Sequence, residues 1–313
     1  MTVLAVDAGQ TEIRAALTDE GRGPRTATAP GVLRMGRRVG PDEVAAGLLA
    51  AIDGLRPLPG RAPPVGVGLS GFEAAGEEDL RRVGELLRGR LAAERLAIAS
   101  DGLTSLLGAL GDRDGAVVAA GTGAVCVARR GARLVKVDGW GALLGDAGSG
   151  FAIGRAGLDA ALRRADGRGG SEALLIAAER RYAPLPELPE RIYADPVPTR
   201  AIAAFAADVA SEAQAGEAEA LAILEAAAEQ LALTACAGLA HLFEPGEPAR
   251  VSHAGNVFRA GPPLLEPFAR AVAARRPGTE VAPPEGDALA GAALLAAVGG
   301  ELRPEPGILW TAR

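Results

Sequence analysis

Short apolar runs, each ending in a polar turn that contains glycine, constrain the fold of this chain more than any other feature. The first run is Thr2–Ala8, and an apolar run at Ile13–Thr18 returns after the turn. A run this short that ends at an acid and a glycine is typical of a buried strand. The order of strand, glycine turn and strand recurs at Ala116–Arg129. Because strands alternate with helical stretches along the first 110 residues, the sequence predicts an α/β fold.

The remaining elements follow from periodicity and length. Further strands are expected at residues 25–29, 65–69, 96–99, 133–137 and 251–255. Helices are expected at residues 41–55, 77–91, 103–110, 151–165, 171–182, 199–215, 217–243, 263–275 and 287–298. The segment Ala183–Pro198 holds five prolines, which predicts an irregular connection.

Composition excludes several classes of protein. The 313 residues suit two domains, and the formal net charge of −6 leaves no bulk positive charge for nucleic acid or an anionic membrane. Lys136 is the only lysine, so the chain has no Walker A motif. The two cysteines and two histidines lack the spacing of a zinc site. Neither a signal peptide nor an apolar run of membrane-spanning length is expected, which favours a cytoplasmic protein.

Two glycine turns are candidates for binding phosphate. The first strand has Asp7 near its end, and the turn after it contains Gly9, Gln10 and Thr11. Backbone N–H groups and a hydroxyl of such a turn can donate to anionic oxygens. Asp7 can also position Mg²⁺, directly or through water. The alternative is an ordinary β-hairpin with polar turn residues.

The second turn, Gly121-Thr122-Gly123, stands between two strands in the same way. By itself it is equally compatible with a plain turn. The pair is more informative than either turn alone, because a triphosphate needs donors from two sides.

A carboxylate at a strand end is a candidate general base. Asp101 lies where a short strand meets a helix, and from there it can take a proton from a substrate hydroxyl. It is equally well placed to be the N-cap of that helix. Ser70 occupies a similar strand end, and it can be a substrate contact or only part of a turn.

The segment GWGALLGDAGSG at residues 139–150 is the part of the chain richest in glycine. Glycine at this density indicates close approach of the backbone to a ligand or to another backbone. Trp140 beside Asp146 suits a sugar, because the apolar face of a sugar ring stacks on indole while its hydroxyls bind carboxylate. The alternative is a glycine-rich surface loop with a buried Trp140.

The remaining polar candidates are weaker. Gly255 and Asn256 follow a strand and can approach an adenosine, or they form an ordinary turn. Cys126, Cys236 and His253 are expected in the core.

Taken in order, the motifs resemble a known family. They are DAGQT at residues 7–11, LSG at 69–71, SDG at 100–102, AGTG at 120–123, the glycine-rich segment at 139–150 and AGNVF at 254–258. The set is similar to the N-acetylglucosamine kinase-like BadF/BadG/BcrA/BcrD ATPase family, of the actin/hexokinase/Hsp70 superfamily. The resemblance covers nearly the whole chain, and residues 139–150 are its most specific part.

The resemblance implies two ribonuclease-H-like lobes that flank a cleft. The amino-terminal lobe would span residues 1–112, with the helical segment 287–313 packing back on it, and the carboxy-terminal lobe would span residues 113–286. ATP and Mg²⁺ would be the cofactors, and the activity would be transfer of the γ-phosphoryl group to a hydroxyl, expected at O6, of an amino sugar such as N-acetylglucosamine or glucosamine. The family's partners are small molecules, and a homodimer is left open.

Residue roles follow from the same resemblance. Asp101 would be the base, and Gly255 and Asn256 would lie near the adenosine. The two glycine turns would hold the phosphates. Sugar contacts would come from Ser70, Trp140, Asp146 and Gly150.

The sequence departs from the family in two places. Gln10 stands where the family usually has glycine, and residues 30–36 lack the asparagine that contacts the amino sugar, so the sugar stays open. Two further functions remain: an ATPase activator of the BadF/BcrA type, which needs cysteines for an iron–sulfur cluster, and a non-catalytic sugar-binding regulator. The positions of Cys126 and Cys236 argue against the activator.

Overall fold

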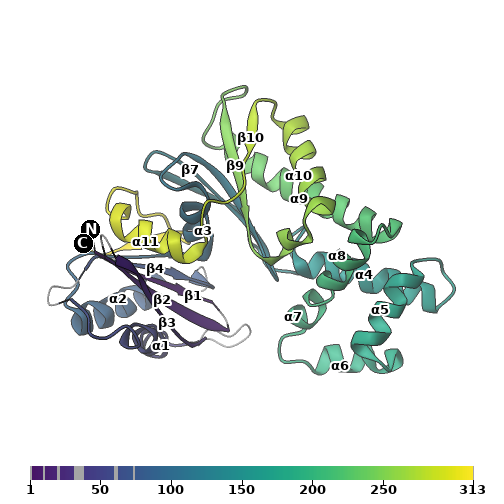
Figure 1. Cartoon of the computed structure of the whole chain (residues 1–313), viewed down its shortest axis with the longest axis horizontal. Coiled ribbons are helices and arrows are strands. Elements are labelled where there is room, and N and C mark those ends of the chain that lie inside the picture. Colours follow the sequence, from purple (N-terminus) through teal and green to yellow (C-terminus); the bar gives the residue numbers. More distant parts are fainter. Residues whose placement is uncertain are drawn as a thin grey trace. The chain divides into compact units, whose positions relative to one another are not determined.

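A computed structural model of the chain describes residues 2–9, 11–19, 22–31, 39–59, 63–72 and 75–312 (Figure 1). Contacts divide the chain into two compact units. The first unit comprises Met1–Val117, Val127–Lys136 and Pro283–Arg313, and the second comprises Val118–Cys126 and Val137–Ala282. The first unit is therefore assembled from segments that lie far apart in the sequence.

The first unit contains a six-stranded sheet with the order β11-β5-β4-β1-β2-β3. Its strands are β1 (Val3–Ala8), β2 (Glu12–Asp19), β3 (Arg22–Pro30), β4 (Val65–Leu69), β5 (Leu96–Ser100) and β11 (Leu309–Thr311). The strands β1, β4 and β5 are parallel neighbours, whereas β2, β3 and β11 pair antiparallel. The hairpin of β1 and β2 expected from the sequence is confirmed, and β11 is an additional edge strand.

Helices cover both faces of this sheet, as the alternation of side chains along β1 shows. Leu4 and Val6 belong to the large core shared with α1 (Pro41–Asp53) and α2 (Glu77–Leu91), whereas Ala5 packs with Ala292 of α11 (Ala288–Val298). Successive residues of a strand point to opposite faces, so α11 lies on the face opposite α1 and α2 (Figure 1). The helix α3 (Asp101–Leu110) packs against α11.

The second sheet has the order β10-β9-β6-β7-β8. Its strands are β6 (Gly115–Ala120), β7 (Ala124–Arg130), β8 (Arg133–Asp138), β9 (Ala249–Ala254) and the unexpected β10 (Thr279–Val281). The helices of the second unit are α4 (Gly150–Ala165), α5 (Glu172–Tyr182), η2 (Leu185–Glu187), α6 (Leu188–Ala194), α7 (Pro198–Ala203), α8 (Ala206–Gln214), α9 (Ala218–Ala240), η3 (Asn256–Ala260) and α10 (Pro262–Arg275). The two sheets with their helices confirm the α/β fold.

Two expectations about the helices were wrong. The proline-rich segment 183–198 is not irregular, because it contains η2 and α6, whose prolines occupy the first helical positions, where no N–H is needed. The single helix expected at residues 199–215 is two helices, α7 and α8, which are separated at Ala204 and Phe205.

The expectation that no segment could span a membrane also needs correction. By length and mean hydropathy alone, α9 passes that test. However, α9 packs against α10, α8 and α4, and buries Leu224, Leu231 and Leu239. A core helix passes the same test, so the hydropathy of α9 is accounted for by its packing.

Candidate functional site

Three of the sequence motifs meet at one edge of the first sheet. The register pairs Ala8 with Leu69 and Leu69 with Ser100, so β1, β4 and β5 end side by side. The Ser70 N–H donates to the Ala8 carbonyl at 3.0 Å. Polar residues that follow parallel strands gather where ligands of open α/β sheets bind. Asp7, Ser70 and Asp101 are therefore brought together at the carboxyl edge of this sheet.

The first glycine turn is a closed hairpin. The Gly9 N–H donates to the Glu12 carbonyl at 3.0 Å, and the Thr11 carbonyl accepts from the Gly31 N–H at 3.0 Å. Gln10 lies outside the described residues. The amide of Gly9 is thus engaged within the turn, and any contact of this glycine with a phosphate would depend on close approach of the chain rather than on its N–H. Thr11 is exposed to solvent.

An arginine that the sequence reasoning missed organises the acids at this edge. Arg14 stands opposite Asp7 in the β1–β2 register, and its Nη2 lies 2.6 Å from Asp7 Oδ2. Its Nη1 lies 2.7 Å from Asp287 Oδ2. The other oxygen of Asp287 accepts from the Ala290 N–H at 3.0 Å and caps α11. One guanidinium therefore joins the first turn to the start of a helix that is distant in sequence.

The titration of Asp287 reflects this position. Partial burial disfavours its charged form, but the Ala290 N–H and the Arg14 guanidinium favour it, and together they lower the pKa of Asp287 below the ordinary carboxyl value. The same two carboxylates raise the pKa of Arg14 in spite of its partial burial.

The structure decides which residue caps α3. The Ser100 hydroxyl accepts from the Leu103 N–H at 3.3 Å, so Ser100 is the N-cap and the capping role considered for Asp101 was wrong. Asp101 is the first helical residue, and its side chain is half-buried. The positive end of the helix dipole stabilises a carboxylate in this turn. Asp101 therefore brings a carboxyl group to the sheet edge without serving as the cap.

In the second unit, the second glycine turn is fixed by the start of α4. The Gly121 N–H donates to the Gly123 carbonyl at 2.8 Å and closes the turn. The Gly150 N–H donates to the Gly121 carbonyl at 2.8 Å, and the Phe151 N–H donates to the Thr122 carbonyl at 3.1 Å. Hence the turn and the end of the glycine-rich segment, which are separated in sequence, form one structure.

Within the glycine-rich segment, Asp146 and Trp140 have opposite environments. Asp146 is only 7% exposed, and its Oδ1 accepts from the Gly141 N–H at 3.3 Å, while its own N–H donates to Asp138 Oδ1 at 2.9 Å. A Cβ on Gly123 would collide with the Asp146 carboxylate. Trp140 is 76% exposed, and Leu143 and Leu144 are exposed as well. The alternative of a buried tryptophan was therefore wrong.

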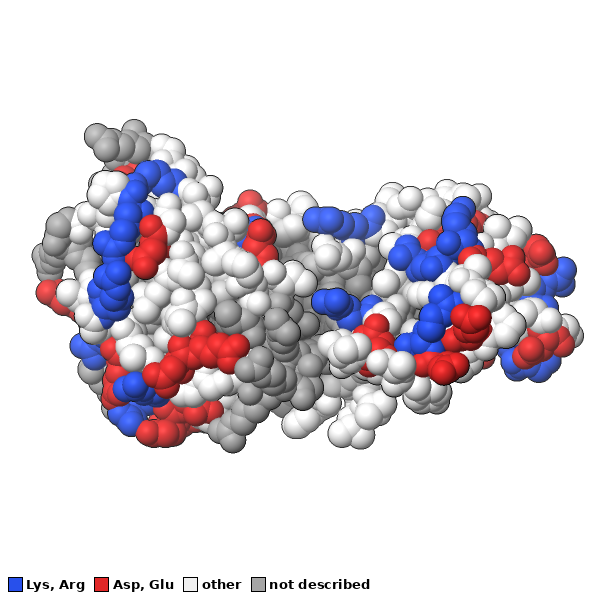
Figure 2. Space-filling view, turned by 90° about the horizontal axis from the view of Figure 1, so that it is seen from below, with Lys and Arg blue, Asp and Glu red and all other residues white. Residues whose placement is uncertain are grey.

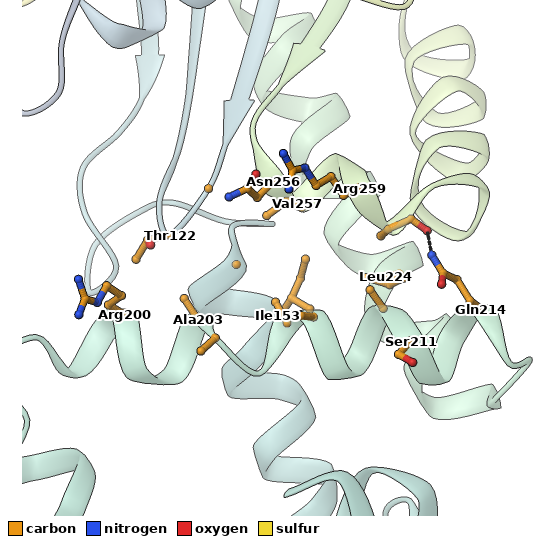
Figure 3. Close-up of a pocket in the computed structure, with 17 residues that line it drawn as sticks. Thr122, Ile153, Arg200, Ala203, Ser211, Gln214, Leu224, Asn256, Val257 and Arg259 are labelled. Atoms are coloured by element: carbon orange, nitrogen blue, oxygen red, sulfur yellow. Dashed lines mark hydrogen bonds between the residues drawn. The ribbon is translucent and has the colours of Figure 1, made fainter. Parts of the chain in front are cut away.

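A cavity of about 540 Å³ in the second unit adjoins the second turn (Figure 3). Four residues singled out from the sequence line it, namely Gly121, Thr122, Gly150 and Asn256. Its volume falls in the range of small-molecule sites. Thr122 lies toward one end of the residues drawn in Figure 3, and Ser211 and Gln214 lie toward the other.

Gly255 allows Asn256 to reach this cavity. Its φ is +95°, and a Cβ there would overlap the Ala120 carbonyl at the end of β6. A left-handed backbone with no room for a side chain requires glycine. The chain therefore turns sharply after β9 and begins η3 at Asn256.

Two arginines that the sequence reasoning did not single out also line the cavity, Arg200 of α7 and Arg259 of η3. Most arginines of known environment have acidic partners, as Arg181 has Asp208, and basic and acidic groups stand close together on the face seen in Figure 2. Within the described residues, Arg200 and Arg259 show no carboxylate partner. No local motif marks them, because helical arginines look alike in a sequence with 32 arginines and one lysine.

Cys126 is buried as expected, whereas Cys236 and His253 are only half-buried, so the expected core position was wrong for these two. Burial raises the pKa of Cys126 to about 12, and burial also raises that of Cys236. A thiol held protonated in the core is a poor ligand for an iron–sulfur cluster. His253 stacks on Phe258, with ring centroids 4.5 Å apart, and burial lowers its pKa. Over the described parts of the chain, no group of three metal-binding side chains occurs.

Two proteins similar to this chain are named as kinases of N-acetylglucosamine. An N-acetylmuramic acid/N-acetylglucosamine kinase from Clostridium acetobutylicum is 27% identical over 222 residues, which cover 70% of this chain and 72% of that protein. The crystal structure of a protein named as an N-acetylglucosamine kinase from Chromobacterium violaceum is 25% identical, with a TM-score of 0.70 over 94% of this chain and 98% of that one.

A more distant likeness concerns the fold alone. A glucokinase from Streptomyces griseus, solved with glucose and AMPPNP, is 18% identical, with a TM-score of 0.56 over 95% of this chain and 99% of that one. The sequence profile of the BadF/BadG/BcrA/BcrD ATPase family matches residues 4–296 of this chain. The chain, with its glycine turns, its acidic sheet edge and its cavity, belongs to the BadF/BadG/BcrA/BcrD ATPase family.

Proposed function

We propose that the protein is an ATP-dependent carbohydrate kinase that transfers the γ-phosphoryl group to O6 of an amino sugar such as N-acetylglucosamine or glucosamine. The observation that carries this proposal is the cavity of the second unit, where a glycine turn, Asn256 and two arginines without acidic partners among the described residues surround one space. The names of the similar proteins support the choice of sugar as acceptor.

The cavity residues suit a nucleoside triphosphate. Thr122 can donate to phosphate oxygens through its hydroxyl and its N–H, whereas the Gly121 N–H is engaged with Gly123. Arg200 and Arg259 can neutralise phosphate charge. The apolar part of the wall, including Ile153, Leu224 and Val257, suits a base or ribose face. Gly255 and Asn256 would then lie along the adenosine, and Gly123 would complete the phosphate turn.

Asp7 is the residue that would hold Mg²⁺. A single carboxylate fits this ion, because Mg²⁺ commonly keeps several waters and takes its other ligands from phosphates. When bound, Mg²⁺ supplies charge neutralisation to the phosphates. Arg14 donates to Asp7 Oδ2 through both Nε and Nη2, which fixes the orientation of the Asp7 carboxylate. Gly9, Gln10 and Thr11 complete the proposed first phosphate turn.

Asp101 is the proposed general base. It would accept the proton of the sugar hydroxyl as that oxygen attacks phosphorus, a contribution of about 10²–10⁴-fold to the rate. Most of the remaining acceleration in phosphoryl transfer comes from positioning and charge neutralisation. Ser70, Trp140, Asp146 and Gly150 are the proposed sugar contacts. For Asp146 and Gly150 this role would be added to the backbone contacts already described.

The broader assignments remain part of the proposal. The lobes would be residues 1–112 with 287–313, and residues 113–286. The protein would act in the cytoplasm on small molecules, as a monomer or a homodimer. An ATPase activator is disfavoured by the burial of Cys126.

The test is a panel of hexoses and amino sugars incubated with ATP and Mg²⁺, with ADP release as the readout and mass spectrometry of the phosphorylated sugar as confirmation. Sugar-dependent ADP release is expected. Failure of every sugar, together with iron and acid-labile sulfide in anaerobically purified protein, would replace the kinase by the activator.

A further inference from the structure

The end of the cavity away from Thr122, called the slot, is lined by residues of two helical segments. The helices α8 and η3 pack against each other. Ala207 and Ala210 line the slot from α8, and Val257 and Ala260 line it from η3. These side chains are small and apolar, and Arg259 of η3 is the charged residue that lines the cavity beside them. Polar side chains lie at the end of the slot, Ser211 and Gln214 of α8.

One hydrogen bond fixes the side-chain amide of Gln214. Its Nε2 donates to the Ala260 carbonyl at 3.0 Å, the dashed line of Figure 3. A carbonyl only accepts, so the NH₂ of the amide must face Ala260 and the orientation of the amide is settled by chemistry. What remains for a ligand is the Oε1 acceptor and the second N–H of Nε2.

A remaining acceptor beside a remaining donor matches the N6/N7 edge of adenine but not the O6/N7 edge of guanine. Adenine offers an amine donor at N6 next to a ring nitrogen acceptor, and a side-chain amide pairs with both at once. Guanine offers two acceptors, O6 and N7, on the corresponding edge, and therefore needs two donors. We propose that Gln214 reads the adenine edge of the bound nucleotide and makes ATP the preferred phosphoryl donor over GTP. This inference rests on the proposed kinase function.

The expected preference follows from one bidentate contact. Such a pair discriminates between bases by roughly tenfold to a hundredfold. The contact exists in the ground state and in the transition state alike, so it changes KM for the nucleotide and leaves kcat nearly constant. A triphosphate of purine riboside, which lacks the 6-amino group, should resemble GTP in its KM.

The experiment measures kcat and KM of the full chain with ATP, GTP and purine riboside triphosphate at a saturating sugar. It compares the wild type with Gln214→Met, which keeps the length and removes both polar atoms, and with Gln214→Lys, which keeps a donor for Ala260 and offers only donors to a base. Gln230→Met is the matched control, because Gln230 is also helical and exposed in the second unit but does not line the cavity.

The wild type and Gln230→Met should prefer ATP by roughly tenfold or more. Gln214→Met should treat the three nucleotides alike, and Gln214→Lys should shift the preference toward GTP, a reversal that misfolding cannot produce. A wild type that uses ATP and GTP equally, or a Gln214→Met variant that keeps the wild-type ratio, overturns the inference while the kinase function stands. Absence of ATP binding and of any sugar phosphorylation in the wild type refutes the kinase function itself, and the inference with it.

Discussion

The two glycine turns begin from the same strand–turn–strand pattern, yet their surroundings differ. The first turn, after β1, closes on itself at an edge that also carries carboxylates: Asp7 beside the turn, Asp101 directly after β5, which lies two strands away, and Asp287 through Arg14. The second turn, after β6, is backed by the start of α4 and opens on a cavity with two arginines. Under the proposed function, the acidic edge would serve the metal ion and the proton transfer, and the cavity would hold the anionic nucleotide.

The largest loss of activity is expected when the proposed base at the acidic edge is removed. Asp101→Asn should lower kcat by about 10²–10⁴-fold, because the amide cannot accept the proton. ATP binding should persist, since the change lies outside the cavity of the second unit. Steady-state kinetics and calorimetric titration with ATP measure the two effects.

The matched control for that variant is Asp42→Asn. Asp42 also lies in the first turn of a helix, on exposed surface, with Arg82 as its partner. Near-normal turnover by Asp101→Asn, or an equal loss in Asp42→Asn, would remove Asp101 from its role.

The second region is tested through its arginines. Arg200→Ala and Arg259→Ala should each raise the dissociation constant for ATP by about tenfold, the size of a lost hydrogen bond to a charged group. Calorimetric titration of ATP is the measurement. Arg168→Ala is the control, because Arg168 belongs to the same unit but is exposed and bound to Asp166. Unchanged ATP affinity in both cavity variants would contradict the proposed nucleotide site.

The backbone at Gly255, directly before Asn256, is expected to tolerate a side chain poorly. Gly255→Ala combines a left-handed backbone with an overlap at the Ala120 carbonyl, whereas Gly246→Ala has a similar φ of +79° and open space around it. Strain at one such position costs about 1–3 kcal/mol. Denaturant unfolding should therefore show Gly255→Ala as the less stable variant of the two, and equal stabilities would mean that the close approach to β6 does not matter.

The smallest expected effect concerns the cap that joins the acidic edge to α11. The folded-state pKa of Asp287 is depressed, so its contribution to stability is full above the ordinary carboxyl pKa of 3.8 and is lost as the pH falls through the lower folded-state value. Asp287→Ala should cost about 1 kcal/mol at neutral pH. The difference from wild type should shrink in strongly acidic solution, and a pH series of denaturant midpoints would reveal a constant difference if this view is wrong.

The sequence was informative wherever local pattern determines structure. The hairpin at the amino terminus and the strands that end before Ser70 and Asp101 depend on short apolar runs and glycine. Arg14, Arg200 and Gln214 could not be found in this way. Their positions depend on strand register or on helices that are brought together only by packing, and their residue types are common on helices and strands. The helical nature of 183–198 was missed because prolines at first helical positions resemble prolines in loops.

The discontinuity of the first unit has a consequence for the chain during its synthesis. The helix α11 covers one face of the sheet together with α3, with Ala292 against Ala5, and β11 supplies an edge strand beside β5. Both emerge from the ribosome long after these strands, because α11 begins about 280 residues after β1 ends and β11 begins about 210 residues after β5 ends. Until then the nascent amino-terminal sheet carries a bare apolar surface, so shortened products that stop before residue 288 are expected to be substrates for chaperones and proteases rather than partly active enzymes.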